Sequence, residues 1–101
     1  MSKFTFSDRA EEDLTHHISY IISNDGYERA SHIYDRIIEK IEILAETPMQ
    51  LSVSRNYIYP ELRMYTNKKL NVSVYFLAHP THIEIIRLRS GGRNVDGLFN
   101  E

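Results

Sequence analysis

The amino-acid sequence predicts an α+β fold in which a helical hairpin packs on one face of an antiparallel sheet. Apolar residues recur at helical spacing in the first half of the chain, and at every second residue from about residue 62 onward. The connections between these segments are short, which favours antiparallel neighbours. The predicted element order is β-α-α-β-β-β, and the length of 101 residues predicts one domain over residues 1–101.

The first predicted elements are a short strand and a helix. Alternation with period two over residues 3–6 indicates the strand. Ser7 then stands where a helix N-cap belongs, because its side-chain oxygen can accept a hydrogen bond from a free amide of the first turn. The helix is expected to end near residues 23–24, and its apolar face is formed by Ala10, Leu14, Ile18, Ile21 and Ile22.

The second predicted helix follows after a very short link. Asp25 with Glu28 resembles a capping box at its start. Apolar residues continue at helical spacing from Ala30 to Ala45. Pro48 ends the helix, since the residue before a proline leaves the α region. The two helices are therefore expected to form an antiparallel hairpin.

Two strands are predicted next. Residues 49–55 show no period and are interpreted as a loop. A strand begins at Leu62 and ends near Thr66, and Asn67 is expected to adopt the left-handed conformation of a tight turn. The following strand presents one apolar face, formed by Leu70, Val72, Val74, Phe76 and Ala78.

The last predicted strand covers residues 83–89, after a turn at residues 79–82. Strict alternation places Ile83, Ile85, Arg87 and Arg89 on one face, and Ile86 and Leu88 on the other. Because both faces carry apolar residues, the second face needs a cover besides the helices. A partner or the C-terminal tail with Leu98 and Phe99 is expected to provide it.

Composition excludes several classes of protein. Apolar residues make up 42% and charged residues 26%, as is usual for a globular domain. The absence of cysteine excludes disulfides, thiolate metal sites and cysteine nucleophiles, and it is compatible with a reducing cytoplasm. No uncharged stretch is long enough to cross a membrane, and no signal peptide follows Lys3, so we expect a cytoplasmic protein.

Charge is distributed unevenly although the net charge is only −2. Residues 1–50 carry 5 basic and 10 acidic side chains, whereas residues 51–101 carry 7 basic and 4 acidic side chains. A basic half attracts acidic partners, either a phosphate backbone or an acidic peptide. The alternative is solvated surface charge without a partner.

Several segments together carry a family pattern. They are residues 6–14 (FSDRAEEDL), Ile18, Tyr20, Gly26, Ala30, residues 41–48 (IEILAETP), Leu62, Arg63, residues 74–76 (VYF), residues 83–88 (IEIIRL) and residues 90–94 (SGGRN). These segments occur in the same order as in the RelE/ParE superfamily of bacterial toxins and cover nearly the whole chain. The sequence therefore resembles this superfamily, on the ParE side.

The resemblance implies the same fold and a toxin that a ParD-like antitoxin neutralises by wrapping it in a hetero-oligomer. For the ParE branch it implies inhibition of DNA gyrase, which traps cleaved DNA and blocks replication. For the RelE branch it implies cleavage of mRNA on the ribosome. A third alternative is an inactive homologue that only binds antitoxin.

The residues favour binding over catalysis. A metal-independent ribonuclease must activate a 2′-hydroxyl, stabilise a pentacovalent phosphate and protonate a leaving oxygen. The RelE-like pattern has an arginine where this sequence has Val72 and a terminal tyrosine where it has Phe99. Arginine does not transfer protons at neutral pH. We therefore expect no catalytic residue, and neither a cofactor nor a metal.

The expected target-binding residues form a basic set: Arg63, Arg87, Arg89 and Arg93. The alternative to target binding is that these arginines form surface ion pairs with Glu61 or Glu84. The expected antitoxin-binding residues combine aromatic and apolar anchors: Tyr57, Tyr59, Leu62, Ile83 and Ile85. The histidines are interpreted as surface residues, with His79 or His82 as the remaining candidate general base.

Overall fold

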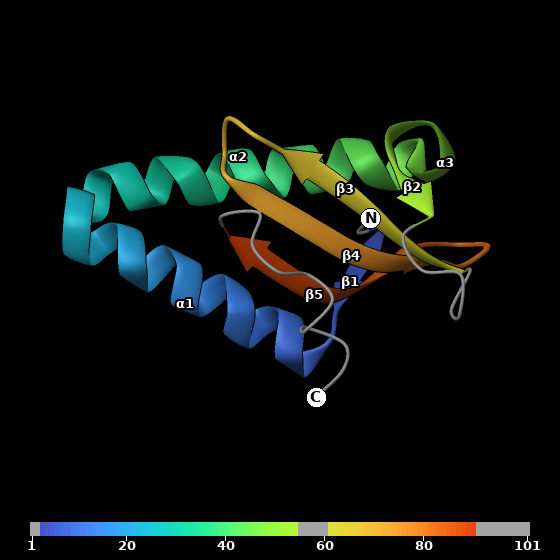
Figure 1. The fold of residues 1–101 in the computed structure, drawn as a ribbon, viewed down its shortest axis with the longest axis horizontal. Coiled ribbons are helices and arrows are strands. Elements are labelled where there is room, and N and C mark those ends of the chain that lie inside the picture. Colours follow the sequence, from blue (N-terminus) through green and yellow to red (C-terminus); the bar gives the residue numbers. More distant parts are fainter. Residues whose placement is uncertain (1–2, 55–60, 91–101) are drawn as a thin grey trace.

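A computed structural model of the chain describes residues 3–54 and 61–90. The elements in chain order are β1 (Phe4–Phe6), α1 (Asp8–Asp25), α2 (Tyr27–Glu46), α3 (Pro48–Leu51), β2 (Val53–Ser54), β3 (Leu62–Asn67), β4 (Val72–Ala78) and β5 (Ile83–Ser90). The five strands form one sheet in the order β1-β5-β4-β3-β2. Strand β1 runs parallel to β5, and the other pairs are antiparallel. The two long helices cover one face of this sheet (Figure 1), which confirms the predicted α+β fold.

The helical hairpin depends on a single linking residue. Gly26 has a φ of 93° and a ψ of 164°, a conformation that side chains with a Cβ rarely adopt. It ends α1 and begins α2, and the helices diverge from there (Figure 1). The predicted capping box is therefore wrong: Asp25 is the last residue of α1, and no side chain caps α2.

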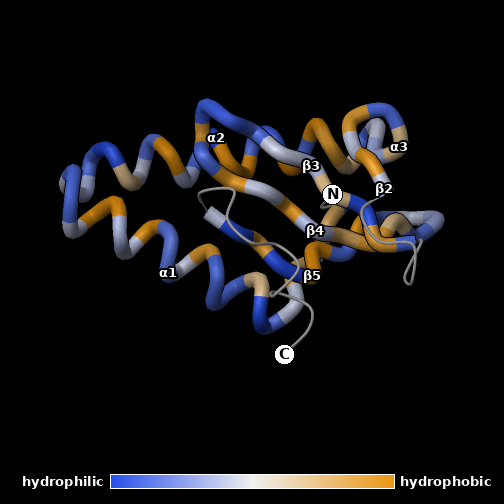
Figure 2. The backbone as a smooth tube through the Cα atoms, in the orientation of Figure 1, coloured by the Kyte–Doolittle hydropathy of each residue, from blue (hydrophilic) through white to orange (hydrophobic). Residues whose placement is uncertain are grey.

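The main core lies between the helices and the sheet. Hydrophobic and hydrophilic residues alternate along both helices (Figure 2), so each helix turns an apolar stripe toward the sheet. The apolar face predicted for the strand after residue 70 is confirmed, with Leu70 and Ala78 at its margins. The buried core residues are Ala10, Leu14, Ile37, Ile41, Leu44, Val72, Val74, Phe76, Ile83, Ile85 and Leu88. No helix in the described ranges is both long and apolar enough to span a bilayer.

Residues 48–54 are more ordered than the predicted loop. Pro48 occupies the first turn of α3, where its missing N–H costs nothing. The two-residue strand β2 then pairs with β3. The turn after β3 also differs from the prediction, because Asn71, with a φ of 56°, adopts the left-handed conformation. Asn67 instead accepts a hydrogen bond from the Leu70 amide through its side chain, at 3.0 Å.

A bulge in β5 overturns the predicted alternation of its faces. Tyr75 pairs with Arg87, but the next residue of β4 pairs with Ile85, so Ile86 is the extra residue. After this extra residue, each side chain of β5 lies on the opposite face of the sheet from the one that strict alternation predicts. Leu88 enters the core beside Ile85, and the arginines leave that face.

The side chains displaced by the bulge lie on the face of the sheet away from the helices. Arg87 stands opposite Tyr75, and Arg89 stands opposite Ser73. The same face carries a smaller apolar cluster of Leu62, Tyr75, Met64 and Leu77. The tail residues expected to cover this face, Leu98 and Phe99, lie outside the described residues.

The start of α1 provides hydrogen-bond partners for carbonyl groups at the edge of β5, beyond the end of the short strand β1. The Ser7 amide donates to the Ile85 carbonyl at 2.8 Å, and the Ser7 hydroxyl donates to the Ile86 carbonyl at 2.7 Å. The Ser7 hydroxyl also accepts from the Ala10 amide, as predicted for an N-cap. One turn further, Asp13 accepts a hydrogen bond from the Leu88 amide at 3.0 Å. Helix α1 and its N-cap are therefore hydrogen-bonded to β5 both at the bulge and two residues after it.

Candidate functional site

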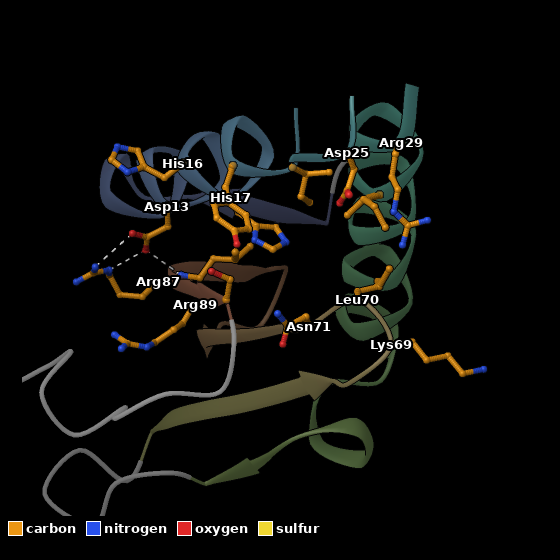
Figure 3. Close-up of a pocket in the computed structure, with 15 residues that line it drawn as sticks. Asp13, His16, His17, Asp25, Arg29, Lys69, Leu70, Asn71, Arg87 and Arg89 are labelled. Atoms are coloured by element: carbon orange, nitrogen blue, oxygen red, sulfur yellow. Dashed lines mark hydrogen bonds and ion pairs between the residues drawn. The ribbon is translucent and has the colours of Figure 1, made fainter. Parts of the chain in front are cut away.

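A cleft of about 690 Å³ lies where α1 meets the end of β5. The turn between β3 and β4 closes another side (Figure 3). Four cationic side chains and two carboxylates line it: Arg29, Lys69, Arg87, Arg89, Asp13 and Asp25. This described lining thus carries an excess of two positive charges in a chain with a net charge of −2.

Arg87 is fixed by a two-pronged ion pair. Its Nε lies 2.8 Å from Asp13 Oδ2, and its Nη2 lies 3.3 Å from Asp13 Oδ1. The side chains are only 16% and 19% exposed, respectively, so water screens the pair less than at an open surface. Neither bond involves Glu61 or Glu84, the ion-pair partners considered from the sequence. Asp13 had no predicted role, since its partner is 74 residues away in the chain.

Arg89 extends on the same side of β5 as Arg87 (Figure 3). Its Nε is buried and has no hydrogen-bond partner among the described residues. The nearest acid of the cleft is already engaged, because Asp13 binds Arg87 and the Leu88 amide. The Arg89 guanidinium therefore retains hydrogen-bonding capacity for an external acceptor.

His17 corrects the interpretation of the histidines as surface residues. It is only 7% exposed, lines the cleft, and its Nε2 is buried without a partner in the described part of the chain. Burial lowers the pKa of its imidazole below the ordinary value of 6.5, because desolvation penalises the charged form. A usable signal was present in the sequence: His17 follows Leu14 by three residues and precedes Ile21 by four, which places it on the apolar stripe.

The other two predicted target-binding arginines are not part of this site as described. Arg63 donates to the Ser52 hydroxyl at 2.7 Å and to the Ser52 carbonyl at 2.8 Å, and so ties β3 to the end of α3. Ser52 in turn donates to the Pro48 carbonyl. Arg63 therefore has a structural role in this segment. Arg93 lies outside the described residues.

The predicted antitoxin contacts need correction at three positions. Ile83 and Ile85 are 1% and 0% exposed, because the helices cover them, so neither side chain can anchor a partner. Leu62 is buried in the cluster with Tyr75 on the opposite face. Tyr57 and Tyr59 lie outside the described residues.

A separate apolar groove of about 620 Å³ lies between the diverging helices. Strand β1 contributes Phe4 and Phe6, whose rings lie 5.8 Å apart. The helices contribute Leu14, Ile18, Tyr34 and Ile38. Sequence reasoning predicted a strand over residues 3–6 and an apolar helix face with Leu14 and Ile18, but no groove, since a groove depends on the angle between two helices and not on periodicity.

His79 and His82 lie at the far end of the sheet. Their rings stack with centroids 4.8 Å apart, and His79 Nε2 lies 3.0 Å from Glu84 Oε1. The turn that carries them precedes β5, whereas Arg89 is near its end. At the rise of an extended strand, Ile83 and Arg89 are about 20 Å apart. These histidines therefore do not share a site with the arginines of the cleft.

The fold and the cleft place the chain in a class of small α+β proteins, in which a helical hairpin covers a sheet with basic residues on its last long strand. One solved structure with this fold is described as a chromosomal ParDE toxin–antitoxin system from P. aeruginosa. The TM-score is 0.72 at 21% sequence identity, over 90% of this chain and 97% of that chain. Comparison with curated protein sequences finds no match.

The family follows from a match over most of the sequence. The model of the ParE toxin of the type II toxin–antitoxin system parDE matches residues 4–95. The chain belongs to this ParE toxin family, which confirms the resemblance inferred from the sequence motifs.

Proposed function

We propose that this ParE toxin inhibits DNA gyrase by binding the gyrase–DNA complex, and that a ParD-like antitoxin neutralises it in a hetero-oligomer. The proposal implies a protein of the bacterial cytoplasm. The cleft that Arg87 and Arg89 line is the proposed contact with the target, and Arg93 remains a proposed contributor.

One observation carries the choice of binding over catalysis: the ion pair between Arg87 and Asp13. A guanidinium paired with a carboxylate is held in place and stays protonated, so Arg87 cannot serve as a proton donor at neutral pH. Val72, which stands near an arginine of the RelE-like pattern, is buried under the helices, so this position does not face the cleft. The stacked histidines are remote from these cations.

The apolar groove between the helices is the proposed antitoxin site on the described surface. An amphipathic segment could place apolar side chains against Phe4, Phe6 and Ile18. Tyr34, which is exposed and lines the groove, would contribute an aromatic contact with a polar end. Tyr57 and Tyr59 remain proposed contacts of the antitoxin.

The test is a gyrase supercoiling and DNA-cleavage assay with purified protein, run beside an mRNA-cleavage assay on translating ribosomes. We expect inhibited supercoiling and linearised plasmid, with intact mRNA. Arg89→Gln should weaken the effect, whereas Arg36→Gln, which removes the same charge from an exposed position of α2, should not. Normal supercoiling together with cut mRNA would overturn the proposal.

A ribosome-dependent ribonuclease is the second candidate, and one observation favours it. His17 lies in the same cleft as Arg87 and Arg89, and burial keeps its imidazole neutral at pH 7, as a general base requires. In that case His17→Gln should abolish mRNA cleavage while gyrase is unaffected. Expression that is harmless without antitoxin, with neither activity, would instead indicate an inactive homologue that only binds antitoxin.

A further inference from the structure

We propose that the cleft between α1 and the end of β5 binds a segment of single-stranded nucleic acid, with Arg89 and Lys69 on its phosphates and Tyr20 against a base. The proposal rests on the proposed function for its biological setting, since it names the part of a gyrase–DNA complex that the cleft would contact. The binding itself can be tested without gyrase.

The positions of the charges suit a ligand with repeated phosphates. Arg87 and Arg89 lie at one side of the cleft, and Arg29 and Lys69 lie at the other, with His17 and Asn71 between them (Figure 3). A free phosphate ion would meet one side only. A chain with successive phosphates can engage both sides, and Arg and Lys are the common partners of a phosphate backbone.

A buried nitrogen donor, Arg89 Nε, supports an anionic acceptor inside the cleft. Arg89 Nε and His17 Nε2 come from different elements, and neither has a hydrogen-bond partner among the described residues. Buried donors are rarely left unsatisfied in native proteins. A phosphate offers several acceptor oxygens that can be reached from different directions, so it can accept from Arg89 Nε and, in the tautomer protonated at Nε2, from His17.

An exposed aromatic side chain distinguishes nucleic acid from an acidic peptide. Tyr20 lines the same cleft and is 68% exposed, although it comes from a helix with a buried apolar stripe. Positively charged grooves with an aromatic platform are typical of single-strand binding, because every base has a face that can stack. The volume of about 690 Å³ is in the range of small-molecule sites and so fits a nucleotide unit, not a lone ion.

The experiment is fluorescence anisotropy of a labelled oligothymidylate of about ten nucleotides, titrated with the full chain between about 50 and 200 mM salt. We expect binding that weakens with salt. Lys69→Gln and Arg89→Gln should each weaken binding and reduce the slope of log affinity against log salt by about 0.7. Tyr20→Ala should weaken binding about tenfold and leave the slope unchanged, because stacking releases no counterions.

Arg36→Gln is the matched control, since it removes one exposed positive charge from α2 outside the cleft. Lys69 and Tyr20 are exposed, so their variants keep the test valid even if Arg89→Gln unfolds the protein. The proposal is overturned by the absence of binding at the lowest salt, by equal losses in Arg36→Gln and Lys69→Gln, or by displacement of the DNA by polyglutamate at equal charge. Binding that requires Lys69 and Tyr20, in a chain without effect on gyrase, would support this inference and overturn the proposed function.

Discussion

At the residue scale, Asp13 links α1 to β5 through its carboxylate. Its carboxylate binds the Arg87 guanidinium at two points and also accepts the Leu88 amide. One side chain of α1 thus neutralises a half-buried cation and satisfies a backbone donor at the edge of β5. Loss of one partner of such a pair leaves the other charge without compensation, which costs more than the pair itself contributes.

We expect Asp13→Ala to lower the free energy of unfolding by about 2 to 3 kcal/mol, since it leaves a cation and an amide without their acceptor. Asp13→Asn should cost less, because its amide oxygen can still accept from Leu88. Urea denaturation measures both, and Glu12→Ala is the control, since Glu12 is exposed beside Asp13. A loss for Asp13→Ala no larger than for Glu12→Ala would contradict this account.

His17 makes the stability depend on pH. Burial holds its pKa in the folded protein below 6.5, so the unfolded chain binds a proton more readily than the folded one. The contribution of neutral His17 is therefore fully present above pH 6.5 and is lost as the pH falls through the lower, folded pKa. Compared with the wild type, His17→Gln should lose less stability between pH 7.5 and 5, as measured by urea denaturation at each pH. His16→Gln, at an exposed position, should behave like the wild type.

At the element scale, α1 and β5 determine each other's geometry. The carbonyls of Ile85 and of the bulged Ile86 lie at the edge of β5, and Ser7 donates to both. The same hydroxyl caps α1. The bulge in turn moves Leu88 into the core and turns two arginines out of it. The start of α1 therefore binds the bulge that determines on which face of the sheet Arg87 and Arg89 lie.

Ser7→Ala should lower the free energy of unfolding by about 2 kcal/mol, because it removes a helix cap and a hydrogen bond to a strand carbonyl together. Ser7→Thr should retain most of the stability, since threonine keeps the hydroxyl. Ser23→Ala, at an exposed position near the end of α1, should change the stability by less than about 0.5 kcal/mol. Thermal unfolding of the three variants tests this, and equal effects of Ser7→Ala and Ser23→Ala would refute the double role of Ser7.

At the scale of the whole molecule, one core joins the hairpin to the sheet. Its residues come from α1, α2, β4 and β5, so neither layer can bury its apolar face without the other. A chain of this size has only a modest core and a net stability of about 5 to 15 kcal/mol. A single cavity at the centre of the sheet therefore affects the entire fold.

Val74→Ala should cost about 2 kcal/mol or more, because it leaves a cavity where both helices pack on β4. Val53→Ala makes the same chemical change on β2, where the side chain is 58% exposed compared with 1% for Val74, and should cost little. Chemical denaturation of the two variants measures the difference. Similar losses at both positions would contradict the assignment of the core.

The order of the elements could be predicted from the sequence because it depends on local patterns. Helical spacing from Ala10 to Ala45, the N-cap at Ser7 and the stop before Pro48 each depend on residues a few positions apart. The alternation from Leu70 to Ala78 identified the buried face of β4 for the same reason. The family motifs were also recognisable, since they are largely core positions in a fixed order.

The candidate site could not be predicted to the same extent. Arg87 and Arg89 were expected to contact a target, but Asp13 and His17, which share their cleft, were not. An ion pair across 74 residues leaves no trace in a local pattern, and neither does a groove between two helices. The faces of β5 were predicted from strict alternation, which a single bulged residue reverses.

The sequence by itself thus determined which segments become helices and strands, since hydrophobic spacing and capping act over a few residues. Only the tertiary structure decided the parallel pairing of β1 with β5, the bulge at Ile86 and the side of the sheet on which the arginines emerge. Those features depend on where Ser7 and Asp13 meet β5, and such long-range hydrogen bonds form only after the helices have packed on the sheet.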